Sequence, residues 1–150
     1  MGLLALPVVG PFEEVPLFDD PFFLYLSPGH ELLEKKSVSL KDLPEKELFV
    51  LSEGHCQRDQ VLEVCSRRNL FSGQLSLEVG SLESLIRMVD QGQGITILPS
   101  LATGYLDAGQ KRRVRSFSGT APSRKVGLVY HRRYLRKKVV EGLKGALLPS

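Results

Sequence analysis

The sequence contains little cysteine and no long hydrophobic run. Its 150 residues include two cysteines, too few for the disulfide scaffolds on which small secreted domains depend. The longest apolar run, Leu3 to Val9, is interrupted by Pro7 and is far shorter than the roughly 20 residues of a membrane-spanning helix. A signal peptide carries lysine or arginine before its apolar run, whereas neither residue precedes this one. We therefore expect a cytoplasmic protein that makes no contact with a membrane.

Acidic residues are almost missing from the C-terminal part. Residues 1–110 carry 8 Lys/Arg against 16 Asp/Glu, whereas residues 111–150 carry 12 Lys/Arg against a single acid, Glu141. The basic candidates are Lys111, Arg112, Arg113, Arg115, Arg132, Arg133, Arg136, Lys137 and Lys138. They fit either a nucleic-acid-binding face or a solvated surface that faces acidic parts of the same assembly. The second interpretation is favoured because no base-reading motif accompanies the charge.

Strand and helix patterns alternate along the chain, which predicts an α/β fold. Extended segments are expected at Leu3–Val8, Val15–Phe18, Phe22–Leu26, Leu48–Leu51, Leu75–Val79, Ile95–Leu98 and Val126–Tyr130. Helices are expected at Asp59–Arg68, between Ser81 and Gly92, and at Tyr134–Leu148. The first extended run is of the kind buried on both faces, and Asp19-Asp20-Pro21 predicts a turn between the second and third.

Two polar residues receive structural rather than functional interpretations. His30 follows a Ser-Pro-Gly turn, and we expect its side chain to be solvated. Thr96 lies inside an apolar strand, where a threonine is more often hydrogen-bonded in the core than in contact with a ligand.

The two cysteines have different surroundings. Cys56 is placed where a helix would begin, beside His55 and two residues before Arg58, and both features favour the reactive thiolate. Cys65 lies in the apolar pattern of the expected helix, which is typical of an inert buried thiol. The two cysteines are therefore either a redox pair or ordinary small apolar residues. His30, His55 and the cysteines lack paired zinc-ligand spacing, so we expect no metal and no cofactor.

The spacing of the two cysteines limits when they can bond. Positions nine apart on a helix differ by about 2.5 turns and by roughly 13 Å along the axis. A disulfide needs Cα atoms within about 7 Å of each other. If Cys56 and Cys65 bond, the helix between them must unwind, and oxidation would then act as a conformational switch.

The segment around the cysteines resembles a known family. The string Gly54-His55-Cys56-Gln57-Arg58-Asp59-Gln60, with Cys65 nine residues after Cys56, is similar to the redox centre of the OxyR family, the peroxide-sensing LysR-type transcription regulators. Further similar segments are Glu14–Pro21, Ser81–Val89, Gly92–Pro99 and Gly127–Tyr130, so that the likeness covers nearly the whole chain.

The resemblance implies a fold and a domain organisation. The fold would be the periplasmic-binding-protein-like LysR effector domain, with two α/β lobes. Residues 19–118 would form the complete second lobe, whereas residues 1–18 and 119–150 would belong to a partial first lobe. The family's winged helix-turn-helix, its linker helix and the first half of lobe one have no counterpart in this sequence.

The resemblance also implies residue roles. Cys56 would be the peroxidatic thiol, which hydrogen peroxide oxidises to a sulfenic acid, and Cys65 would resolve it as a disulfide. His55, Arg58 and Asp59 would surround the peroxide and activate the thiolate. The chain would switch a homodimer or homotetramer and would be reset by glutaredoxin or thioredoxin. Promoter DNA and RNA polymerase would be reached only through the full-length protein.

Two other functions remain open from the residues alone. The chain could be an effector domain that binds a small organic anion, with incidental cysteines. It could also be a thiol peroxidase with Cys56 as nucleophile. The second is disfavoured because peroxiredoxins carry threonine three residues before the reactive cysteine, where this chain has Glu53.

Overall fold

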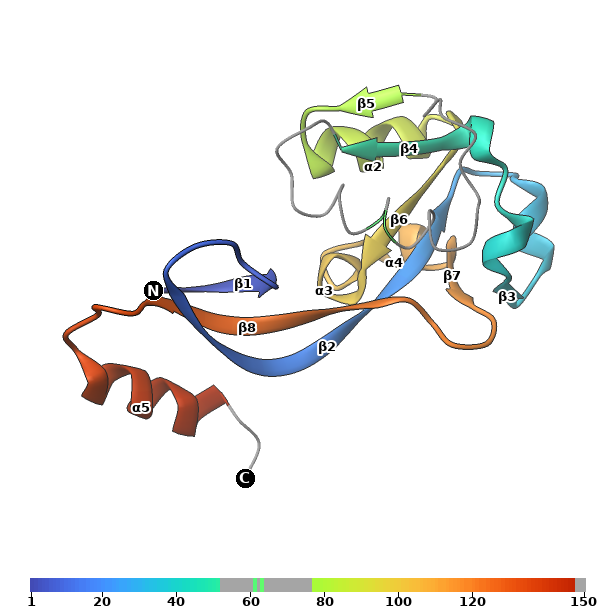
Figure 1. The fold of residues 1–150 in the computed structure, drawn as a ribbon. Helices are drawn as coiled ribbons and strands as arrows, with labels where there is room; N and C mark the ends of the chain where they lie inside the picture. Colours follow the sequence, from blue (N-terminus) through green and yellow to red (C-terminus); the bar gives the residue numbers. More distant parts are fainter. Residues whose placement is uncertain (52–60, 62, 64–76, 148–150) are drawn as a thin grey trace. The chain divides into compact units, whose positions relative to one another are not determined.

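The chain forms two compact units in the computed structural model (Figure 1). The structure describes residues 1–51, 61, 63 and 77–147. The first unit combines Met1–Asp20 with Ser123–Ser150, and the second comprises Pro21–Pro122. The assignment of residues 19–118 to a complete second lobe, and of 1–18 and 119–150 to a partial first lobe, stays a prediction.

The first unit is a small sheet with one helix. Its elements are β1 (Gly2–Leu6), the first part of β2 (Phe12–Leu26), β8 (Ser123–His131) and α5 (Lys137–Leu147). The strand order is β1-β8-β2, and β1 runs antiparallel to β8 with Leu4 opposite Gly127. Valine and leucine residues of β8 supply the buried face of the unit, together with Val140 of α5. The expected terminal helix is present, but it begins at Lys137 rather than at Tyr134.

The expectation that the first strand is buried on both faces is wrong. Leu3 is 53% exposed and Leu4 is 47% exposed. The reason is topological, because β1 is the last strand in its sheet order and pairs with β8 alone among the described strands. An uninterrupted apolar run predicts a strand, but it does not distinguish an edge strand from a central one.

The prediction of a turn at Asp19-Asp20-Pro21 is also wrong, because β2 runs through these three residues without a break. Ion pairs with the neighbouring strand replace the turn. Asp20 is 2% exposed and accepts a 2.9 Å hydrogen bond from Nε of Arg124. Asp19 forms a 3.0 Å pair with Lys125 at the surface. The two aspartate side chains, which could otherwise hydrogen-bond the backbone of a local turn, thus bind side chains of β8 instead.

The second unit is built on a mixed sheet with the order β2-β6-β4-β5, with β7 on the other side of β2. Its further strands are β3 (Ser37–Val38), β4 (Leu48–Leu51), β5 (Leu77–Val79), β6 (Ile95–Pro99) and β7 (Val114–Phe117). Its helices are α2 (Leu82–Asp90), α3 (Ser100–Thr103) and α4 (Ala108–Lys111), with 3-10 turns at Glu31–Glu34, Leu40–Asp42 and Glu45–Glu47. β4 is parallel to both β5 and β6, whereas β2 is antiparallel to β6. A hydrophobic core lies against this sheet, as expected for an α/β layer.

Helix α2 begins and ends where its sequence predicts. The side chain of Ser81 accepts a hydrogen bond from the backbone N–H of Ser84, which is the expected N-cap. Gly92 has a φ of +87°, which a residue with a side chain rarely adopts, and it follows the end of the helix. Leu85 and Val89 are buried on the sheet-facing side. In the described part of the chain, no helix is both long and apolar enough to span a membrane.

Candidate functional site

The five predicted site residues, His55, Cys56, Arg58, Asp59 and Cys65, lie outside the described residues. Their roles therefore stay predictions. The structure does describe the strands that flank this segment, since β4 ends at Leu51 and β5 begins at Leu77.

The flanking strands fix where the cysteine segment leaves and re-enters the sheet. β4 and β5 are parallel neighbours, with Phe49 opposite Leu77. Parallel neighbours require a crossover connection, so residues 52–76 start at the carboxyl end of one strand and return to the amino end of the other. β6 is also parallel to β4 and ends at the same edge. In α/β sheets, ligand sites form at this carboxyl edge.

One residue between the two cysteines is anchored in the core. Val61 is helical, 3% exposed, and belongs to the main hydrophobic cluster together with Leu48, Ile95 and Ile97. Glu63, two positions later, is helical and exposed. The connection is thus attached to the sheet by a buried side chain midway between Cys56 and Cys65.

A polar cluster of the second unit surrounds Asp90, at the end of α2. Its Oδ1 accepts hydrogen bonds from the hydroxyl of Tyr25 at 2.5 Å and from Nη2 of Arg113 at 2.6 Å. Its Oδ2 accepts a 2.9 Å hydrogen bond from the side-chain amide of Gln110. Arg113 also donates to the carbonyl of Leu26 and lies 5.0 Å from the centre of the Tyr25 ring. The cluster therefore joins β2, α2, α4 and the start of β7.

Burial and hydrogen bonding have opposite effects on the pKa of Asp90. Burial by itself would raise its pKa, but the hydrogen bonds from Tyr25, Arg113 and Gln110 outweigh this effect and hold the pKa below the ordinary aspartate value. Burial, and then the hydrogen bond to Asp90, raises the pKa of Tyr25 above its ordinary value. The cluster is a neutral phenol and a carboxylate–guanidinium pair at neutral pH, and such an arrangement holds a fold together rather than transferring protons.

The two polar residues given structural interpretations have different outcomes. Thr96 is 1% exposed and donates a 2.9 Å hydrogen bond to the carbonyl of Phe49, which confirms it as a core residue. The expectation that the His30 side chain is solvated is wrong, since it is 7% exposed. Nδ1 of His30 caps a 3-10 turn by accepting from the N–H of Leu32, and Nε2 lies 3.1 Å from Glu47. The two ring nitrogens find partners locally, which allows the ring to be covered.

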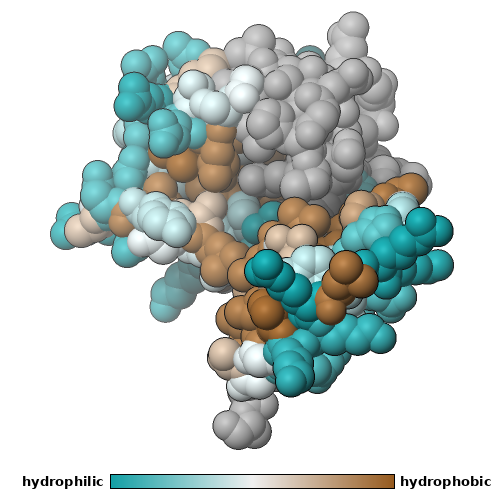
Figure 2. Space-filling model, turned by 90° about the vertical axis from the view of Figure 1, so that its left-hand side faces the viewer, coloured by the Kyte–Doolittle hydropathy of each residue, from teal (hydrophilic) through white to brown (hydrophobic). Residues whose placement is uncertain are grey.

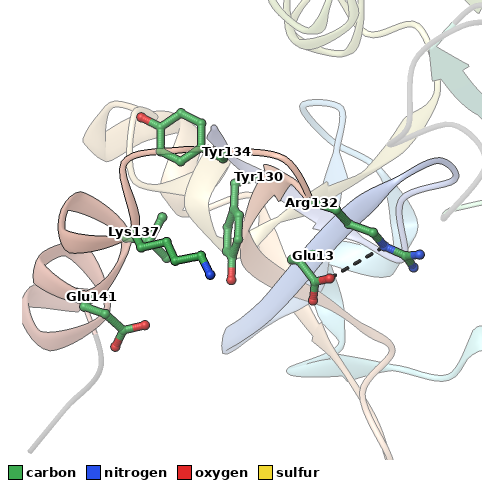
Figure 3. A pocket seen from close by; sticks show the side chains of 7 residues that line it. Glu13, Tyr130, Arg132, Tyr134, Lys137 and Glu141 are labelled. Atoms are coloured by element: carbon green, nitrogen blue, oxygen red, sulfur yellow. Dashed lines mark ion pairs between the residues drawn. The ribbon is translucent and has the colours of Figure 1, made fainter.

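A pocket of about 280 Å³ lies in the first unit (Figure 3). Its lining consists of Glu13, Tyr130, Arg132, Tyr134, Lys137, Val140 and Glu141. The Tyr130 ring lies between Lys137 on one side and the Glu13–Arg132 pair on the other, and that pair is separated by 3.6 Å. Two acids and two bases line the same space, so the pocket has no excess of either charge. Within the residues that the structure describes, no three His, Cys, Asp or Glu side chains are placed to hold a metal ion.

Sequence reasoning missed the Asp90 cluster and misplaced two basic residues. Arg113 and Arg115 are candidates for the basic face, but Arg113 pairs with Asp90 and Arg115 donates to carbonyls that include those of Lys35 and Leu33. The partners are far apart in the sequence, so no local pattern marks them. The one available signal is an acid, Asp90, at the C-terminal end of a helix, where the macrodipole disfavours it.

Comparisons with known proteins address the family. The model of the LysR substrate binding domain matches residues 2–149. A probable hydrogen peroxide-inducible genes activator of Mycobacterium avium is 32% identical over 153 residues, which cover 99% of this chain and 49% of that protein. The reduced OxyR regulatory domain of Pseudomonas aeruginosa is 33% identical with a TM-score of 0.81, covering 97% of this chain and 70% of that one. A reduced OxyR of Neisseria meningitidis is 34% identical with a TM-score of 0.80, and the match covers 97% of this chain and 68% of that one.

These matches decide fold and family together. The chain spans about half the length of the Mycobacterium and Streptomyces relatives it matches. The α/β, periplasmic-binding-protein-like fold expected from the sequence is confirmed, and so is the resemblance to the OxyR family. The chain belongs to the LysR substrate-binding domain family, and within it to the group of OxyR regulatory domains.

Proposed function

We propose that the chain is the redox-sensing regulatory domain of a hydrogen-peroxide-responsive transcription activator. The observation that carries this proposal is the similarity of 97% of the chain to a reduced OxyR regulatory domain at 33% identity. The Gly54-His55-Cys56 string, with its second cysteine at Cys65, is the part of this similarity that points to redox sensing. The protein acts in the cytoplasm as a homodimer or homotetramer, and promoter DNA and RNA polymerase are engaged by the full-length protein.

The switch consists of two balanced steps. The Cys56 thiolate attacks one oxygen of hydrogen peroxide, the O–O bond breaks, and the departing hydroxide is protonated to water. The resulting sulfenic acid is then attacked by the Cys65 thiolate, which forms the disulfide and releases a second water. Two thiols are thereby oxidised and one peroxide is reduced to two waters. Glutaredoxin or thioredoxin supplies the electrons that restore both thiols.

The sheet supports placing this chemistry at its carboxyl edge. Cys56 is five residues beyond Leu51, so its Cα lies no more than about 18 Å from the Cα of Leu51. His55 and Arg58 lie close to Cys56 in the sequence, and together with Asp59 they surround the peroxide and activate the thiolate under this proposal. Every residue in this step belongs to the connection between β4 and β5.

The burial of Val61 links oxidation of the cysteines to a structural change. A continuous helix from Cys56 to Cys65 would keep the two sulfurs apart. Val61, which lies between them in the sequence, is helical and buried. Forming the disulfide would then unwind this segment, and under the proposal Val61 leaves its position in the core. Oxidation is therefore coupled to a rearrangement of the second unit.

Mass spectrometry under non-reducing conditions tests the proposal. One equivalent of hydrogen peroxide is added to the reduced chain, and circular dichroism is recorded on the same sample. A Cys56–Cys65 bond with loss of helical signal supports the switch. Cys65→Ser is expected to accumulate a sulfenic acid at Cys56 that a dimedone probe traps, whereas Cys56→Ser is expected to remain reduced at the same dose.

Two results would contradict the proposal. Two intact thiols after minutes of exposure would favour an effector domain for a small organic anion, whose binding Cys56→Ser would leave unchanged. Continuous consumption of peroxide with a recycling reductant, without a structural change, would favour a thiol peroxidase.

A further inference from the structure

The cations of the first unit divide into two groups. Arg124, Lys125, Arg132 and Lys144 each form an ion pair with an acid of the same unit. The other four are consecutive or nearly so in the sequence: Arg133, Arg136, Lys137 and Lys138. No side-chain partner is found for these four among residues 1–51, 61, 63 and 77–147, and all four are exposed. We refer to them as the cation cluster.

Part of the cation cluster surrounds an open hollow of about 420 Å³. The hollow is lined by His131, Arg133, Tyr134, Leu135 and Arg136, and no acid is among them. It differs in this respect from the smaller pocket of the same unit, where Glu13 and Glu141 offset Arg132 and Lys137. Figure 2 shows hydrophilic surface directly beside apolar surface on one face of the protein.

The four charges of the cation cluster do not stabilise the fold. They repel one another, and Lys137 and Lys138 form the first turn of α5, where the structure has no acid. Cations in the first turn of a helix are disfavoured by its dipole, whereas acids are favoured there. These four exposed cations form no ion pair among the described residues, and two of them line an open hollow without an acid. Such an arrangement fits an anionic partner.

We propose that the cation cluster binds the phosphodiester backbone of a DNA duplex, without reading its sequence. Arg133 and Arg136 donate to phosphate oxygens in the hollow, and the Tyr134 hydroxyl is a further donor at its wall. Lys137 and Lys138 add positive charge next to it. This goes beyond the proposed redox switch and uses none of its residues.

The sequence alone favours a surface that faces acidic parts of the same assembly, but binding to the phosphodiester backbone needs no base-reading motif, and the composition of the cluster fits nucleic acid. The cores of protein interfaces are depleted in lysine. Interfaces with DNA are strongly positive, and contacts to phosphate come mainly from arginine, lysine and hydroxyl groups. Between residues 131 and 140 the chain has five Lys/Arg and no acid. A protein partner is therefore the alternative that the experiment must exclude.

Fluorescence anisotropy of a labelled duplex of about 20 base pairs and arbitrary sequence tests the proposal. The complete reduced chain is titrated at about 50 and about 200 mM salt, because phosphate contacts are recognised by their salt dependence. The test variant carries Arg133→Gln, Arg136→Gln, Lys137→Gln and Lys138→Gln. The control variant removes four exposed cations of the second unit that have no partner in the described part, through Lys36→Gln, Arg87→Gln, Lys111→Gln and Arg112→Gln.

We expect the test variant to bind at least about tenfold more weakly at the lower salt concentration. Its slope of log affinity against log salt should be shallower by about 3 to 4, close to one for each lost phosphate contact. The control variant should keep most of the affinity. A charge-preserving variant, Arg133→Lys with Arg136→Lys, should also bind, and circular dichroism checks that each variant is folded.

Three results would overturn the proposal. These are no binding of the duplex by the unmodified chain at low salt, equal losses in the test and control variants, and binding of a polyglutamate peptide that exceeds binding of the duplex. Because no peroxide is used, none of these results bears on the redox switch.

Discussion

Asp90 Oδ1 lies 2.6 Å from Nη2 of Arg113, and this pair fastens the last residue of α2 to the segment that enters β7. The two residues are separated by 23 positions in the sequence, and both belong to the second unit. The hydroxyl of Tyr25 shares the same carboxylate oxygen. One carboxylate therefore sets the position of α2 relative to β2 and β7.

Removing the charge of Asp90 should destabilise the second unit. In Asp90→Asn, Arg113 loses its ionic partner and Tyr25 loses a strong acceptor. We expect the free energy of unfolding to fall by about 1–3 kcal/mol, since hydrogen bonds to charged groups are worth more than neutral ones but the pair is partly exposed to solvent. Urea denaturation followed by far-UV circular dichroism measures the change. Asp42→Asn, which breaks the exposed Lys35–Asp42 pair, is the control and should cost less than about 1 kcal/mol. An equal loss of unfolding free energy in the two variants would show that the cluster around Asp90 stabilises the chain no more than an exposed ion pair does.

The same carboxylate predicts a pH dependence. The pKa of Asp90 is lower in the folded chain than its ordinary value of 3.8, so the unfolded state takes up a proton at higher pH than the folded state. Its stabilising contribution is therefore complete above about pH 5 and is lost as the pH falls through 3.8 towards the lower folded pKa. Comparing the unfolding free energies of the unmodified chain and Asp90→Asn between pH 6 and about 3 tests this, because the difference between them should shrink on acidification. A difference that stays constant with pH would contradict the assignment.

Arg124 and Lys125 are neighbours on β8, and they form ion pairs in opposite environments. Arg124 pairs with Asp20, which is 2% exposed, whereas Lys125 pairs with Asp19, whose side chain is 60% exposed. Arg124→Met leaves a buried carboxylate without this partner and should cost about 3 kcal/mol. Lys125→Met should cost less than about 1 kcal/mol. Thermal and urea unfolding of the two variants gives the comparison, and a cost at Lys125 as large as that at Arg124 would be inconsistent with the burial of Asp20.

Val61→Ala should change both stability and redox behaviour. Truncating this buried side chain should lower the unfolding free energy of the reduced chain by about 1–3 kcal/mol. Under the proposed switch, Val61 is buried in the reduced state and released on oxidation, so the variant should favour the disulfide. The reduction potential of the Cys56–Cys65 pair should become more negative by about 20–60 mV, measured against a glutathione or dithiothreitol series.

Val38→Ala is the matched control for this prediction. Val38 is 0% exposed and belongs to the same hydrophobic cluster as Val61, but it lies on β3 and not between the cysteines. It should destabilise the chain to a similar degree while leaving the potential unchanged. A shift of the potential by Val38→Ala as large as that by Val61→Ala would attribute the effect to general loss of stability.

The sequence could predict the elements whose signals are local. The α2 helix is an example, since Ser81 supplies its N-cap, Gly92 follows its end, and the apolar positions between them recur at helical spacing. The family could also be recognised, because the string around Cys56 is specific and continuous. The roles of the cysteines are implied by that likeness, whereas their spacing predicts only that a bond between them would unwind a helix, and both predictions await the experiments described above.

Only the tertiary structure decided features that depend on partners distant in the sequence. Asp19 and Asp20 look like turn residues, but Lys125 and Arg124 draw them into one continuous strand. Arg113 and Arg115 look like part of a basic surface, but a carboxylate and backbone carbonyls of the second unit engage them. The physical reason is the same in each case: a local pattern records what a residue can form with its neighbours, whereas burial and ion pairing depend on segments that folding brings together.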